Sequence, residues 1–139
     1  MTNTNYKTIA SKIKFEGRAF INGKYVDAID GEKFETINPA TGETLCSVAK
    51  CNSKDVDLAV KVSRKAFNSG VWSRTSPEFR KDVLLKFAEL LRKHGVENSV
   101  LECIDTGKLI GDCINEVAND APMHFQWYGE LIDKVFGKV

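Results

Sequence analysis

Short apolar runs separated by turn residues dominate residues 18–49. Phe20-Ile21 and Tyr25-Val26 flank Asn22-Gly23, a pair typical of a type I′ hairpin turn because both positions need positive φ. A second pair of runs, 34–37 and 45–49, encloses the turn residues Pro39 and Gly42. The pattern predicts two β-hairpins, preceded over residues 1–17 by a flexible arm or a frayed helix, with order beginning near Phe15.

The apolar spacing becomes helical after Cys51. We expect one helix capped by Ser53 and ended by Gly70, and a second capped by Ser76 with Pro77 in its first turn. The second should close with a left-handed cap at Gly95. In the first of these helices, the apolar stripe consists of Val56, Val60, Ser63 and Phe67. In the second, the face expected to be buried consists of Val83, Leu84, Phe87, Leu90 and Leu91.

Three further helices follow. One is expected from about 97 to 105 with its stop at Gly107, and one over 110–118. The last should have Asn119-Asp120 as its cap and Pro122 in its first turn, and it should run to Phe136. Its apolar side would consist of Phe125, Tyr128, Leu131, Ile132 and Val135.

Composition places the chain among folded proteins and excludes some partners. Its 139 residues, 42% hydrophobic and 28% charged, suit one domain or part of one. The net charge of +1 gives no support to a nucleic-acid role. No signal region and no long apolar run occur, so we expect a cytoplasmic protein without a membrane partner.

The four cysteines, Cys46, Cys51, Cys103 and Cys113, could form two disulfides. Without a sign of secretion, buried or half-buried free thiols are the favoured interpretation. Their spacing does not match structural zinc sites, and His94 and His124 form no ligand pattern.

General motifs reveal no active site. Glycine loops for phosphate and the serine nucleophile elbow are both missing from the sequence. An aromatic platform of Trp72, Trp127 and Tyr128 is conceivable, but aromatic residues on apolar faces are more often core. Acidic residues at positions 112, 116 and 120 would line one face of an unbroken helix. That face is either simply solvated or attracts a cation.

Several motifs that occur in a fixed order indicate one protein family. F-I-N-G-K-Y-V at 20–26, F-E-T-I-N-P-A-T-G-E at 34–43 and D-T-G-K at 105–108 occur in order, followed by Trp127-Tyr128. This order resembles the opening of the NAD(P)-dependent aldehyde dehydrogenases, most closely the γ-glutamyl-aminobutyraldehyde and other amino-aldehyde dehydrogenases. The resemblance runs from about Arg18 to Val139, with Leu109 departing from the proline usual after D-x-G-K.

The resemblance implies an α/β fold with a Rossmann-like cofactor domain, to which this chain would supply the hairpins and a layer of helices. It implies oxidation of an aldehyde to a carboxylic acid with NAD or NADP, through a thiohemiacetal on a cysteine. The nucleophile, the base and the cofactor loop lie beyond the matching region. None of the four cysteines occupies the nucleophile's motif, so the chain is expected to hold no catalytic or cofactor-binding residue and to bind neither nucleotide tightly alone.

Two smaller sites are implied by the same resemblance. Backbone carbonyls of Thr36 and Ile37 with the carboxylate of Asp105 would hold a monovalent cation, unless Asp105 merely closes a helix end. Glu116 and Asp120, with Asn119 between them, would border the substrate entrance of an amino-aldehyde enzyme.

Two functions follow as hypotheses. Residues 18–139 would be an incomplete amino-terminal portion of the cofactor-binding domain, inactive alone, whose partners are the remainder of the fold, a full-length relative and copies of itself in a homo-oligomer. Alternatively, the chain is a stand-alone interaction or assembly module without catalysis. Its final residues, which break off where the family continues into an oligomerisation hairpin, favour the enzyme segment.

Overall fold

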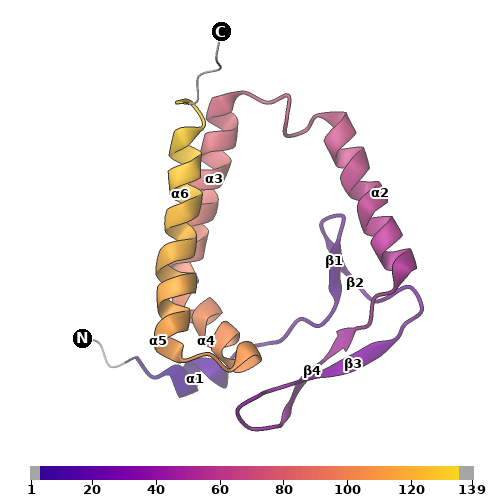
Figure 1. Cartoon of the computed structure of the whole chain (residues 1–139), viewed down its shortest axis with the longest axis vertical. Coiled ribbons are helices and arrows are strands. Elements are labelled where there is room, and N and C mark those ends of the chain that lie inside the picture. The colour runs from indigo at the N-terminus through magenta and orange to yellow at the C-terminus, as the bar shows by residue number, and fades with distance from the viewer. Residues whose placement is uncertain (1–3, 135–139) are drawn as a thin grey trace. The chain divides into compact units, whose positions relative to one another are not determined.

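The computed structural model describes residues 4–134 of the chain (Figure 1). Its backbone contacts divide the chain into two compact units. Residues 14–74 form one, called here the hairpin unit. The other, the helical unit, comprises the described residues up to 13 and those from 75 onward.

The hairpin unit consists of two antiparallel hairpins and one helix. Its elements are β1 (Ala19–Ile21), β2 (Lys24–Val26), β3 (Lys33–Ile37), β4 (Thr44–Ala49) and α2 (Ser53–Ser69). Between β1 and β2, Asn22 has φ 54° and Gly23 has φ 75°, which is the type I′ geometry that the sequence predicts. Strand β3 pairs with β4 in antiparallel register, which a bulge interrupts between Thr36 and Ile37. Both predicted hairpins are therefore confirmed.

The first turn of helix α2 is hydrogen-bonded to the segment between the two hairpins. Asn52, not Ser53, is the N-cap, and its side chain accepts a hydrogen bond from the Lys54 N–H at 2.8 Å. Asp55 completes a capping box by accepting from the Asn52 N–H at 2.9 Å. Its other carboxylate oxygen accepts from the N–H of Ile29, also at 2.9 Å. Asp55 is 2% exposed and links the helix to the segment between the hairpins.

The helical unit is built on two long antiparallel helices, α3 and α6, which lie side by side in Figure 1. Its elements are α1 (Tyr6–Ala10), α3 (Pro77–Lys93), α4 (Gly95–Thr106), α5 (Ile110–Cys113), a π-helix η1 (Ile114–Asp120) and α6 (Ala121–Leu131). Ser76 caps α3 and Pro77 begins it, as predicted. Gly129 of α6 lies against Leu84 and Leu85 of α3.

Of the two predicted alternatives for the amino-terminal segment, a flexible arm or a frayed helix, the structure shows a short helix. Residues 6–10 form α1, whose N-cap Asn5 accepts a hydrogen bond from the Thr8 N–H at 3.1 Å. This short helix packs against α4. Regular structure therefore begins before Phe15, because a side-chain cap and a tertiary contact support a sequence that lacks apolar period.

One continuous helical path, through α5, η1 and α6, replaces the two separate helices that were predicted. Asp120 is helical at φ −73° and its side chain makes no capping hydrogen bond, so the predicted cap is wrong. Pro122 lacks an N–H, and its ring would collide with the carbonyl of residue 118 in an α-helix. Wider i→i+5 turns accommodate it, with the Ala121 N–H donating to Glu116. The predicted end at Phe136 lies outside the described residues.

Gly95 serves a different purpose from the predicted left-handed cap. Helix α3 ends through His94, with φ −103°, and Gly95 begins α4 without positive φ. A Cβ on Gly95 would lie 2.8 Å from the Cβ of Ala118. Close approach of α4 to the π-helix therefore demands the glycine. The predicted stop of α4 at Gly107, in the left-handed conformation, is confirmed.

The predicted apolar face of α2 is exposed, and that of α3 is only partly buried. On α2, Val60 and Phe67 are 61% and 68% exposed. On α3, Phe87 and Leu90 are 42% and 44% exposed, while Leu84 and Leu91 are half-buried. The fully buried side chains of the helical unit are small, namely Ala88, Ser99, Val100, Cys113 and Pro122. Periodicity correctly located the apolar sides. Helix α6 covers part of the α3 face, where the ring centroids of Phe87 and Phe125 lie 4.6 Å apart, whereas the α2 face is largely exposed.

Candidate functional site

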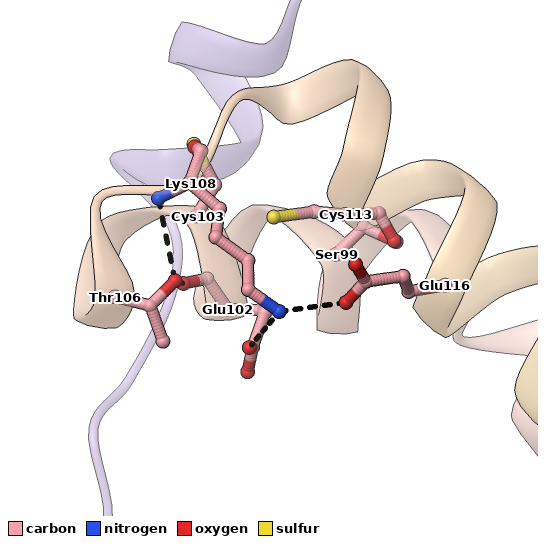
Figure 2. Close-up of polar contacts among 7 residues, drawn as sticks. All are labelled: Ser99, Glu102, Cys103, Thr106, Lys108, Cys113 and Glu116. Carbon is pink, nitrogen blue, oxygen red and sulfur yellow. Dashed lines mark hydrogen bonds and ion pairs between the residues drawn. The ribbon is translucent and has the colours of Figure 1, made fainter.

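An ion triad lies where the loop after α4 meets the π-helix (Figure 2). The Lys108 ammonium is 2.6 Å from a carboxylate oxygen of Glu116 and 3.6 Å from one of Glu102. Glu102 belongs to α4 and Glu116 to η1. Lys108 therefore joins two helices through their acidic side chains.

The backbone of Lys108 is held on both sides. Its N–H donates to the Thr106 hydroxyl at 3.4 Å, and its carbonyl accepts from the Cys103 thiol at 3.1 Å. Thr106 in turn donates to the Glu102 carbonyl at 2.7 Å. The ammonium consequently projects from a loop that is fixed against the end of α4.

The two carboxylates stabilise the charged form of Lys108. The hydrogen bond from Lys108 to Glu116, together with the charge of that carboxylate and of Glu102, raises the pKa of Lys108 above its ordinary value. The side chains of Lys108 and Glu116 are 45% and 54% exposed, so the pair is also in contact with water. The cluster holds two carboxylates and one permanent cation near neutral pH.

Ser99 of α4, which is drawn in the same view, is buried (Figure 2). The Ser99 hydroxyl is within hydrogen-bonding distance of two carbonyls, that of Gly95 at 2.7 Å and that of Cys113 at 3.1 Å. Burial raises the pKa of the Cys113 thiol. A buried thiol with a raised pKa stays protonated and is a poor nucleophile.

The three residues predicted at a substrate entrance lie together on η1. Glu116, Asn119 and Asp120 are all exposed. The carboxylate of Asp120 forms no ion pair with a residue of the described part of the chain, whereas Glu116 is paired with Lys108. Their role at a substrate entrance stays a prediction. Sequence reasoning missed Lys108 as a partner, although it closes the D-T-G-K motif.

The predicted cation site involves both units. Thr36 and Ile37 lie at the β3 bulge in the hairpin unit, whereas Asp105 lies near the end of α4 in the helical unit. Their approach to one another stays a prediction. Within residues 4–134, no group of three or more His, Cys, Asp or Glu side chains gathers as a metal site.

Two expectations about side-chain burial require correction. None of the four cysteines forms a disulfide, as the favoured interpretation has it, but Cys51 is exposed rather than buried or half-buried. Trp72, Trp127 and Tyr128, interpreted as core, are 44%, 66% and 61% exposed. Positions near helix ends or on apolar helix faces suggested burial, but Trp72 lies in a turn beyond α2, and Trp127 and Tyr128 are largely exposed on α6. None of the helices within residues 4–134 has the length and apolarity needed to cross a membrane.

The hairpins and the helix layer together define an α/β arrangement, and comparison with known proteins identifies it. A family model described as the aldehyde dehydrogenase family matches residues 25–139. The chain therefore belongs to the aldehyde dehydrogenase family, as the motifs in its sequence predict.

The relatives include amino-aldehyde enzymes. Aminoacetaldehyde dehydrogenase of Pseudomonas aeruginosa is 40% identical over 136 residues, which is 98% of this chain and 27% of that protein. The crystal structure of gamma-glutamyl-gamma-aminobutyraldehyde dehydrogenase from Burkholderia cenocepacia matches 96% of this chain and 27% of its own, with a TM-score of 0.92 and 42% identity. Indole-3-acetaldehyde dehydrogenase of P. syringae, solved in complex with NAD+, has the same TM-score and coverages and 40% identity. This chain spans about a quarter of the length of these relatives.

Proposed function

We propose that this chain is the amino-terminal segment of an enzyme that oxidises an aldehyde to a carboxylic acid with NAD or NADP. The observation that carries the proposal is the family match over residues 25–139. The similarity to an enzyme solved with NAD+ supports a nicotinamide cofactor. The cysteine nucleophile, the glutamate base and the nucleotide loop would come from other parts of the complete protein, so the isolated chain would be inactive.

The substrate class that we propose is an amino-aldehyde. Glu116, Asn119 and Asp120 present oxygen-rich side chains on one exposed helical segment, and carboxylates attract an ammonium group electrostatically. Relatives named for aminoacetaldehyde and for gamma-glutamyl-gamma-aminobutyraldehyde accord with this choice. The P. syringae relative, named for an indole aldehyde, is equally similar. The preference therefore rests on these side chains rather than on overall likeness.

We further propose that the complete protein brings Thr36, Ile37 and Asp105 together around a monovalent cation. Backbone carbonyls and a carboxylate are suitable oxygen ligands for such an ion. The exposed apolar faces of α2 and α3 would be covered by the remainder of the fold, in a homo-oligomeric, cytoplasmic enzyme. Burial of these faces would stabilise the assembly, since each large apolar side chain removed from water contributes roughly 1.5–3 kcal/mol.

A chimeric enzyme tests the proposed function. Residues 25–139 would replace the aligned segment of the Pseudomonas aeruginosa relative, and NAD(P)H formation would be followed with aminoacetaldehyde and with an uncharged aldehyde of similar length. The parent enzyme is the positive control, and the 139-residue chain alone is the negative one. We expect turnover by the chimera and none by the isolated chain. A chimera that folds and assembles like its parent but oxidises neither aldehyde would contradict the proposal.

A further inference from the structure

We propose that Asn22 is a site of spontaneous covalent modification, at which the Asn22-Gly23 dipeptide rearranges through a cyclic imide to aspartate and isoaspartate. The dipeptide forms the turn between β1 and β2, where Asn22 has φ 54° and Gly23 has φ 75°. Both residues are exposed. The inference concerns the chemistry of the hairpin itself and does not depend on the proposed function.

The reaction needs only the side-chain amide, the next backbone nitrogen and water. The Gly23 nitrogen attacks the side-chain carbonyl carbon of Asn22, a C–N bond forms, and the amide leaves as ammonia, which takes up the proton of the Gly23 N–H through solvent. Water then opens the five-membered imide. Opening at the side-chain carbonyl gives aspartate, whereas opening at the backbone carbonyl gives isoaspartate, whose main chain runs through the Cβ and Cγ atoms of residue 22.

Three features of the β1–β2 turn favour the attack. A Cβ added to Gly23 would meet no atom within 4 Å beyond its chain neighbours, so the space around the nucleophile is open. The Gly23 N–H donates no hydrogen bond within residues 4–134. The hairpin has three paired positions, and an isolated two-stranded hairpin is only marginally stable. The backbone rotation that ring closure requires therefore has a low cost here.

A second dipeptide of the same kind, Asp30-Gly31, is protected. Gly31 also has positive φ, 74°, but the Asp30 carboxylate accepts hydrogen bonds from the Glu32 N–H at 3.0 Å and from the Asn52 side-chain amide at 2.6 Å. The bond from the Glu32 N–H is the main cause that lowers the pKa of Asp30. A carboxylate anion is a poor electrophile, and this one is also held in place. The two dipeptides are therefore unequal.

Asparagines within helices provide an internal comparison. Asn68 lies in α2, Asn98 in α4 and Asn119 in η1. In a helix the next backbone N–H belongs to the hydrogen-bond ladder, so its nitrogen can reach the side-chain carbonyl only after local unfolding. Conversion should therefore be concentrated at the β1–β2 turn.

The test uses a second chimera, in which the whole chain replaces the aligned part of the Pseudomonas aeruginosa relative. It would be incubated at mildly alkaline pH, and its digest would be analysed by mass spectrometry after separation of aspartate and isoaspartate peptides. The free peptide of residues 18–28 gives the rate without tertiary structure. We expect Asn22 to convert in the chimera within about tenfold of its rate in the peptide, because the hairpin is short.

The helical asparagines should convert at least about tenfold more slowly than Asn22 in the same sample, and Asn22→Gln, which could close only a six-membered ring, should remove the reaction at the turn. Asp30 should yield isoaspartate at least about tenfold faster in a urea-unfolded sample than in the folded chimera. Conversion of Asn22 that is no faster than that of the helical asparagines, or more than about tenfold slower than in the peptide, would overturn the proposal.

Isoaspartate would also alter the hairpin. Its longer main chain does not fit a two-residue turn, so the register that pairs Phe20 with Tyr25 is lost, together with the edge-to-face contact of their rings at 5.1 Å. Aspartate fits, since Asp-Gly is itself typical of a type I′ turn. Trypsin should therefore cleave after Lys24 at least about threefold faster in the isoaspartate fraction than in freshly prepared Asn22→Asp. Equal cleavage of the two would refute this consequence.

Discussion

Replacing Asp55 with alanine removes the link between α2 and the hairpins. One carboxylate oxygen accepts from the Ile29 N–H and the other from the Asn52 N–H, both at 2.9 Å. The first bond joins residues that are 26 positions apart in the sequence. The second completes the capping box of α2. The substitution therefore affects both the helix start and its attachment.

The magnitude follows from the number and kind of bonds lost. A hydrogen bond to a charged group contributes about 1.5–3 kcal/mol to stability. Asp55 is 2% exposed, so its bonds are shielded from water, but Ile29 is 54% exposed and its N–H can be hydrated once the carboxylate is gone. We therefore take the lower end for each bond and expect a loss of about 3 kcal/mol in the free energy of unfolding of the hairpin unit.

Amide hydrogen exchange provides a local assay. In the chimeric enzyme that carries residues 25–139, the Ile29 and Asn52 amides should be protected, and Asp55→Ala should accelerate the exchange of both together. About 3 kcal/mol corresponds to roughly a hundredfold in the exchange rate if opening is an equilibrium step. The matched control is Asp57→Ala, on the same helix but exposed. If the two variants behaved alike, or if only Asn52 changed, the proposed link to Ile29 would be refuted.

Other predictions concern the helical unit and the whole chain. Gly95→Ala should lower the thermal midpoint, measured by circular dichroism, because its Cβ would lie 2.8 Å from that of Ala118; an unchanged midpoint would refute the close approach. The pKa of Asp133 is lowered to about 2 by hydrogen bonds from Lys134 and Lys81. The contribution of the Asp133 carboxylate to folding stability should be complete above its unfolded pKa, about 3.9, and should be lost as pH falls through about 2. A carboxyl carbon NMR titration of Asp133 with a midpoint near 4 would contradict this. The isolated chain should self-associate or unfold readily, given its exposed apolar faces; light scattering that finds a monodisperse monomer, with a sharp cooperative melt, would argue for the stand-alone module.

Local signals were the part of the fold that the sequence could predict. Asn22-Gly23 determines a turn through its own backbone preferences, and Ser76-Pro77 begins a helix through one hydroxyl and a fixed φ. Neither needs knowledge of distant residues. The cap of α2 was misplaced by one residue because Asn52 and Ser53 are both good caps, and the choice depends on the tertiary contact between Asp55 and Ile29.

Features that depend on partners could not be predicted in the same way. Periodicity shows which side of α2 or α3 is apolar, but it does not show what covers that side. The π-helix arises from Pro122 within a path that packing keeps helical, where isolated rules predict a break. Lys108 and Glu116 meet across a loop and a helix start, eight positions apart, so no rule for neighbours on one helix face would pair them.

The most direct test of the account is the intact mass and activity of the natural gene product, captured from its source with an antibody against this chain. We predict a protein far heavier than 15.5 kDa whose purified form produces NAD(P)H when an amino-aldehyde is added. A natural product of 15.5 kDa that binds no larger relative and oxidises no aldehyde would contradict the assignment of this chain to a working aldehyde dehydrogenase.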